Sequence, residues 1–305
     1  MHLQDNRTGW VPLQNLYAKN DNITDLVGGN NDAEEDLKQS PRVINTPNQL
    51  LYVARQGLRF QIFDTVLWND LYECALELSG DFQPRQWVQL VHIFKRIKVK
   101  HRGLLDLATR ELLYHLDRLS LEDLSKLALS FAWHGYCHSD MFSRIAEVVT
   151  TRLRREKMHE VPDVAKIDDA DATDPGSTGK EPQKNSALSK ITSYTHLLGA
   201  FSKCEVAHKE LFEAVAADLV DQIRSKEMLI PPGFLSKIFA SYARFGYRHV
   251  TLFDALSKEM VTAKIPTEQL ASIQKMMKAL DYENDIMLNI FAYRLGNAVQ
   301  GSENQ

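Results

Sequence analysis

The sequence of 305 residues lacks several features that mark whole classes of protein. No stretch approaches the roughly 18 consecutive apolar residues of a membrane-spanning helix, so we expect no membrane insertion. The N-terminus has no basic region followed by an apolar stretch, so we expect no secretory signal. It is also unlike a mitochondrial presequence, which is poor in acids, because residues 1–45 hold four Lys/Arg against seven Asp/Glu.

Cysteine is scarce and widely spaced. The three residues Cys74, Cys137 and Cys204 form an odd set with no framework spacing, which predicts a reducing compartment. They lie in apolar helical stripes, and we interpret them as small core residues.

Motifs for catalysis and cofactor binding are also missing. The sequence has no G-x-S-x-G, H-E-x-x-H or kinase-type run. The segment DDADATD carries Asp174 where a calcium loop needs Gly, and Lys180 where that loop needs Glu. The GSTGK at 176–180 lacks the spacing of a phosphate loop. We therefore expect no enzyme, no cofactor, no metal and no small-molecule substrate.

The chain does contain an internal repeat. A histidine recurs fourteen residues after an apolar anchor, in the pairs Trp87–His101, Leu124–His138, Tyr194–His208 and Leu235–His249. A further unit keeps the frame from Leu270 but carries Asn284 in place of the histidine. The apolar pattern of each unit predicts two helices with a break between them. No segment shows the alternation of apolar and polar residues that is typical of a strand. Self-similarity at this period predicts an all-α fold, an α-solenoid of five to six helix-turn-helix repeats of about 37 residues.

Composition divides the chain into five parts. We predict a flexible acidic arm at 1–45, the first repeats at 46–157, a disordered acidic insert at 158–186, the remaining repeats at 187–296 and a polar tail at 297–305. The insert explains why two anchors lie 70 residues apart when the other spacings are 35 to 41.

Two interpretations of the histidines His101, His138, His208 and His249 remain open. They could face RNA or a metal, or each could satisfy free backbone groups at the start of the second helix. The structural role is favoured, because one histidine per repeat is too sparse for zinc, which needs about four ligands. His134, Cys137 and His138 cluster in one turn but lack a second pair of ligands.

The strongest binding signal is a basic run across one predicted turn. Its cations are Lys95, Arg96, Lys98, Lys100 and Arg102. Other units add Lys203, Lys209, Arg244 and Arg248 at or near the same turn. These side chains are either a solvated rim with favourable cations at helix C-termini, or a ridge that contacts phosphates.

The amino-acid sequences of two repeats resemble those of known repeat families. LEDLSKLALSFAWHGYCHSDMFSRIAEVV and PGFLSKIFASYARFGYRHVTLFDALSKEM resemble the helical hairpins of the octotricopeptide and heptatricopeptide families, and the repeats that precede RAP domains in FAST-kinase-like proteins. The resemblance covers about residues 83–296 and implies a mitochondrial or plastid α-solenoid that binds RNA. It transfers no catalytic residue.

Together these observations predict a non-catalytic adaptor in organellar, mitochondrial RNA metabolism, within a mitoribosome or an RNA-processing complex. Its partners would be RNA, through the phosphate backbone, and other proteins of a ribonucleoprotein. The alternative is a protein–protein scaffold that holds a partner helix in its groove without RNA contact. Salt dependence separates the two, because phosphate binding weakens steeply with ionic strength.

Overall fold

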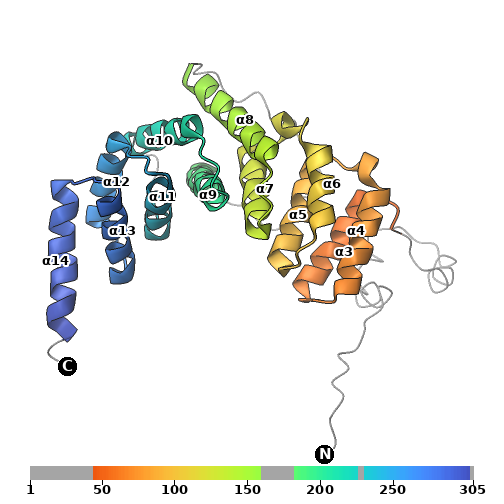
Figure 1. Cartoon of the computed structure of the whole chain (residues 1–305), viewed down its shortest axis with the longest axis horizontal. Coiled ribbons are helices and arrows are strands. Elements are labelled where there is room, and N and C mark those ends of the chain that lie inside the picture. The colour runs from red at the N-terminus through yellow and green to blue at the C-terminus, as the bar shows by residue number, and fades with distance from the viewer. Residues whose placement is uncertain (1–43, 159–181, 226–229, 303–305) are drawn as a thin grey trace, which may run out of the picture. The chain divides into compact units, whose positions relative to one another are not determined.

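A computed structural model describes residues 44–158, 182–225 and 230–302 (Figure 1). Residues 1–43 of the acidic arm predicted at 1–45, and residues 159–181 of the insert predicted at 158–186, lie outside the described residues. The chain divides into two compact units, Met1–Ala108 and Thr109–Gln305, and the boundary falls inside one helix. The units are taken separately below.

Within the described residues the fold is all-α, which confirms the predicted class: twelve α-helices and two short 3₁₀ turns, with no strand. The first unit holds α3 (Pro47–Arg59), α4 (Thr65–Glu77), η2 (Ser79–Asp81), α5 (Pro84–Ile97) and the start of α6 (Arg102–Leu112). The second unit continues with η3 (Leu116–Arg118), α7 (Leu121–His134), α8 (Ser139–Met158), α9 (Pro182–Lys203), α10 (Lys209–Arg224), α11 (Pro232–Phe245), α12 (Val250–Thr262), α13 (Thr267–Ala279) and α14 (Asp285–Ser302). The helix α9 thus begins within the segment assigned to the insert, and α14 extends into the segment assigned to the tail.

In the second unit each α-helix packs on its second neighbour along the chain. In the second unit α7, α9, α11 and α13 form one layer of successive contacts, and α8, α10, α12 and α14 form the other (Figure 1). In the first unit α3 packs on α5 in the same way. Two side-chain hydrogen bonds join that pair, from Arg55 to Gln89 at 2.8 Å and from Gln86 to Asn48 at 2.7 Å. Such packing is that of stacked helical hairpins.

Every hairpin turns through a residue in the left-handed backbone region. The positions with positive φ are Gln61, Lys98, Gly135, Glu205, Gly246 and Asp281. In each turn the next N–H donates to the carbonyl five residues back, as Tyr136 does to Phe131 at 3.0 Å. This pattern ends a helix and pairs an apolar residue with the last turn. The sequence marks only two of these positions with glycine.

Aromatic rings link consecutive hairpins of the second unit. Phe142, at the start of α8, meets Phe201 of α9 with ring centroids 5.0 Å apart. Phe212 of α10 meets Tyr242 of α11 at 5.1 Å, and Phe253 of α12 meets Tyr282 at 5.2 Å. These rings are almost completely buried, so the core runs from one hairpin into the next.

The expectation for the cysteines is wrong in two of three cases. Cys137 and Cys204 lie in consecutive turns, not in the core, and their sulfur atoms are bonded in a disulfide. The repeat explains the error, because residues 67 apart in sequence meet when the turns stack. Cys74 on α4 is half-buried and free. Burial and the nearby Glu77 raise the pKa of its thiol.

Among the helices that the structure describes, none combines the length and the apolar character needed to cross a bilayer.

Candidate functional site

The turns between the two helices of each hairpin carry the residues singled out in the sequence. In the second unit these turns contact their neighbours: Cys137 bonds to Cys204, Arg244 pairs with Glu205 at 3.2 Å, and Arg248 pairs with Asp281 at 3.8 Å. We call this row of turns, residues 135–138, 203–209, 244–249 and 281–284, the turn edge of the second unit. The first unit has two equivalent turns, one from Gln61 to Asp64 and one at residues 95–102, and we call the second the basic turn.

The recurring histidines cap the second helix of their hairpins. Each Nδ1 accepts a hydrogen bond from the backbone N–H three residues later. The donor–acceptor distances are 3.1 Å for His101 and Leu104, 3.4 Å for His138 and Met141, 3.3 Å for His208 and Leu211, and 3.2 Å for His249 and Leu252. The first N–H groups of a helix have no partner within the helix, so the ring satisfies one of them.

Two other side chains cap the second helix of their hairpins from the position that histidine occupies elsewhere. Asp64 accepts from the N–H of Val66 at 3.0 Å, and Asn284 accepts from that of Ile286 at 2.9 Å. Both follow the left-handed residue of their turn by three positions, as every one of the histidines does. The position therefore requires an acceptor, and histidine is one of three residue types that supply it. Burial lowers the pKa of His101, which favours the neutral ring that can accept at Nδ1.

Replacing His249 tests the capping role. We expect His249→Ala to lower the free energy of unfolding by about 1 kcal/mol, the usual cost of losing an N-cap. His249→Asn should keep most of that stability, because Asn284 caps α14 with its amide oxygen. Thermal and chemical denaturation of the three proteins measure the difference. Equal losses in both variants would show that the ring, and not its acceptor atom, is what the turn needs.

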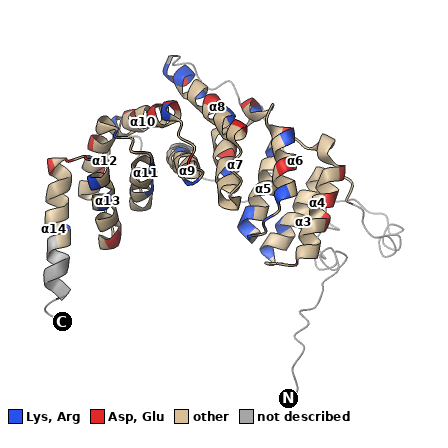
Figure 2. Ribbon diagram, viewed as in Figure 1, with Lys and Arg blue, Asp and Glu red and all other residues tan. Residues whose placement is uncertain are grey.

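Five cations of the first unit fall within residues 95–102, where α5 ends and α6 begins, and Figure 2 shows Lys and Arg in blue on both helices. Arg96, Lys98, Lys100 and Arg102 are exposed, and no acidic residue lies between Lys95 and Arg102 in the sequence. The ion pair from Arg102 to Asp106 is long, at 4.0 Å, and both groups are exposed. Lys95 is partly buried, and this burial, with the neighbouring Arg96, lowers its pKa. The turn thus holds a concentrated positive charge.

Most of the predicted cations on the turn edge of the second unit form ion pairs. Arg244 pairs with Glu205, Arg248 with Asp281, and Lys209 with Glu213 at 3.5 Å. Lys203 is exposed beside Cys204. Three of the four thus have acidic partners, whereas residues 95–102 contain no acidic residue.

A cavity of about 220 Å³ opens on this edge. Its lining combines cations with aromatic rings: Lys209, Phe212, Glu213, Tyr242, Gly246, Tyr247, Arg248 and His249. The Tyr247 ring contacts Phe212 edge-on, with centroids 5.4 Å apart, and leans on Phe245 at 5.6 Å. A ring fixed in this way beside Lys209 and Arg248 could support a base and a phosphate. Tyr247 was not among the residues predicted to bind, although the G-Y turn of the repeat marks it.

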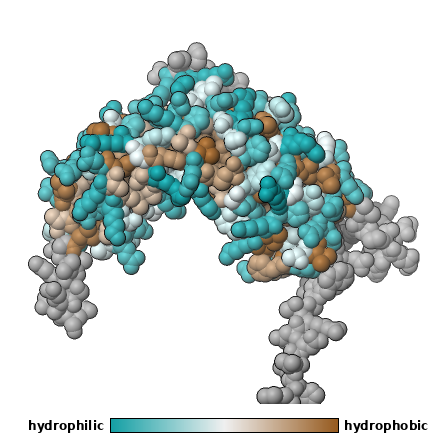
Figure 3. All heavy atoms as spheres, viewed as in Figure 1, coloured by the Kyte–Doolittle hydropathy of each residue, from teal (hydrophilic) through white to brown (hydrophobic). Residues whose placement is uncertain are grey.

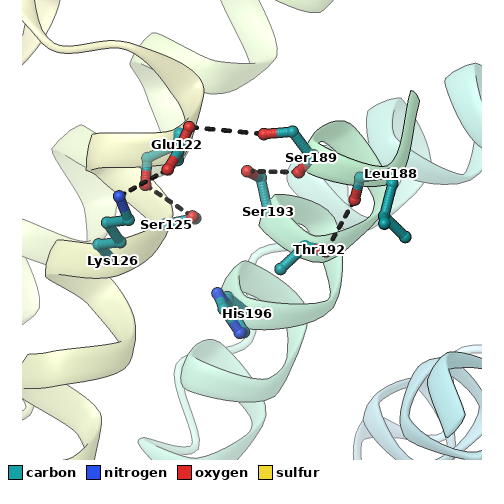
Figure 4. A pocket seen from close by; sticks show the side chains of 8 residues that line it. All are labelled: Glu122, Ser125, Lys126, Leu188, Ser189, Thr192, Ser193 and His196. Atoms are coloured by element: carbon teal, nitrogen blue, oxygen red, sulfur yellow. Dashed lines mark hydrogen bonds and ion pairs between the residues drawn. The ribbon is translucent and has the colours of Figure 1, made fainter. Parts of the chain in front are cut away.

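A second cavity, of about 290 Å³, lies between α7 and α9 (Figure 4). Seven of its eight lining residues have polar side chains, Leu188 being the exception: Glu122, Ser125, Lys126, Leu188, Ser189, Thr192, Ser193 and His196. The hydroxyls of Ser125, Thr192 and Ser193 donate to carbonyls of their own helices at 2.7–2.9 Å. Glu122 is held by Lys126 at 2.5 Å and by the Ser189 hydroxyl at 3.4 Å. These groups serve the helices and one another, so the cavity offers a weaker case for ligand binding than the turns do.

Metal binding finds no support in the described residues, which contain no group of three or more His, Cys, Asp or Glu placed to hold an ion. The turn with His134 and His138 has its cysteine bonded to Cys204, and His138 uses Nδ1 as a cap.

Comparison with models of protein families finds no match, and no curated protein matches the chain. The structure by itself defines the class: an all-α protein of stacked helical hairpins, in which side-chain caps and ion pairs organise the turns.

Proposed function

We propose that this chain is a non-catalytic helical-repeat adaptor that binds RNA through phosphate contacts. The observation that carries the proposal is the basic turn of the first unit, with five Lys/Arg in eight residues and no acid among them. Neutralising phosphates with such side chains supplies most sequence-independent affinity for nucleic acid. The cavity beside Tyr247 adds a second contact of the same kind, where a ring can support a base.

The architecture we propose is an α-solenoid of six hairpins. Six turns share a left-handed residue followed three positions later by a capping side chain, and helices pack on their second neighbours within each unit. The resemblance of the hairpin sequences to organellar repeat proteins supports a mitochondrial or plastid location and a role in a ribonucleoprotein.

Salt dependence of RNA binding tests the proposal. A filter-binding series with single-stranded RNA should show a log–log slope of about −3.5, because each of five phosphate contacts contributes about −0.7. Affinity should then fall about 100-fold between 50 and 200 mM salt. Binding that does not change with salt, or no binding at 50 mM, would contradict the proposal.

A scaffold function without RNA is the second candidate. It is favoured by α14, where Leu288 is 48% exposed and Tyr293 is 72% exposed on the last described helix. On the face drawn in Figure 3, apolar residues reach the surface in patches between hydrophilic ones. Binding of a partner helix to such residues would persist at high salt, which separates it from phosphate binding.

A further inference from the structure

The disulfide joins two turns whose backbones are held in place by other interactions. Cys137 lies between Tyr136, whose N–H donates to Phe131 at 3.0 Å, and the capping residue His138. The N–H of Cys204 donates to Ala200 at 3.0 Å, and the next turn residue is the left-handed Glu205. The Cα atoms are 5.3 Å apart, within the range that a disulfide requires. The hydrogen bonds that shape the two turns are therefore separate from the disulfide itself.

Further along the turn edge, ion pairs connect consecutive turns. Arg248 stands in the register of Cys137, thirteen residues after its anchor, and it reaches Asp281 in the next turn. Arg244 reaches back to Glu205, beside Cys204. Side-chain interactions thus connect consecutive turns repeatedly along this edge, and the connection between the turns of Cys137 and Cys204 is covalent.

From this placement we infer that Cys137 and Cys204 are a reversible oxidation site that locks the α7–α8 hairpin to the α9–α10 hairpin. The oxidant is a small disulfide of the glutathione class. The thiolate of the exposed Cys137 attacks one sulfur of oxidised glutathione and releases one glutathione thiolate. The Cys204 thiolate then attacks Sγ of Cys137 and releases the second. Two protein thiols are oxidised, and one oxidised glutathione becomes two reduced molecules.

Reversibility follows from the exposure of the site. Cys137 is exposed and Cys204 is partly exposed, so a thiol can reach the bond. The sequence predicts a reducing compartment, and in such compartments disulfides outside thermophiles are usually transient, catalytic or redox-sensing. The bond closes a loop across 67 residues of sequence, a length at which a cross-link restricts the unfolded chain strongly. Oxidation should therefore stabilise the second unit. This chemistry does not depend on whether the chain binds RNA.

The experiment uses the full chain with Cys74→Ser, which leaves only the pair. The protein is equilibrated with mixtures of oxidised and reduced glutathione, free thiols are alkylated, and the products are read by mass spectrometry. We expect one intramolecular cross-link in oxidising mixtures, both thiols alkylated in reducing ones, and a melting temperature roughly 5–15 °C higher in the oxidised form. The matched control, Cys74→Ser with Cys137→Ser, should melt like the reduced protein under both conditions.

Three outcomes would overturn the inference: both cysteines stay alkylated in excess oxidised glutathione, each carries a separate glutathione, or the cross-links join different chains. Circular dichroism of the reduced proteins shows whether either substitution disturbs the helices.

Discussion

With Lys95, Arg96, Lys98, Lys100 and Arg102 all replaced by glutamate, the affinity for single-stranded RNA is expected to fall more than 100-fold at 100 mM salt. These side chains concentrate five positive charges on one turn, and four of the five are exposed. The variant loses the favourable phosphate contacts and adds repulsion in their place. The salt slope of any remaining binding should also become shallower, because fewer counterions are released. Filter binding across a salt series measures both effects.

A matched control separates local contact from total charge. Five exposed cations of the second unit outside the turns can be reversed to give the same change in net charge: Arg154, Arg224, Lys258, Lys264 and Lys275. This control should keep RNA affinity within about tenfold of the parent, because none of the five residues belongs to the turn that we propose to contact phosphates. If both sets weaken binding equally, the effect is one of net charge and the basic turn is not a site. If the first set leaves affinity unchanged, the RNA proposal loses the observation that carries it.

The helices and the turn register could be predicted from the sequence because both are local. A histidine fourteen residues after each anchor marks the start of the second helix, and the structure places His138 and His249 there as caps. The capping atom is a property of a few neighbouring residues, so a repeated pattern reveals it. Even the departure at Asn284 keeps an acceptor in place.

The partners across neighbouring turns could not be predicted, since they depend on how hairpins stack. Nothing in the local sequence links Arg244 to Glu205, or Cys137 to Cys204. The acidic partners of Arg244 and Arg248 come from the hairpin before or after. The left-handed backbone of residues such as Glu205 could not be predicted either, because glycine occupies only two of these positions, Gly135 and Gly246.

Phe253 provides the sharpest test of the stacking itself. It lies eighteen residues after Leu235, and its ring contacts Tyr282 of the next hairpin at 5.2 Å and Phe239 of its own at 5.1 Å. The side chain is fully buried. Phe253→Ala should lower the free energy of unfolding by about 3–5 kcal/mol, the usual cost of removing a core ring and leaving a cavity. The melting temperature of the second unit should drop by roughly 6–20 °C.

Leu288 occupies the same register on α14, eighteen residues after Leu270, yet it is 48% exposed because no described helix covers it. Leu288→Ala should therefore cost about 1 kcal/mol or less. Phe253→Leu, which puts the α14 residue into the buried position, should fall between the two. Denaturation of the three variants distinguishes the effect of position from that of side-chain size. Equal losses for Phe253→Ala and Leu288→Ala would mean that the hairpin after α12 does not cover Phe253, and the stacking order would then be wrong.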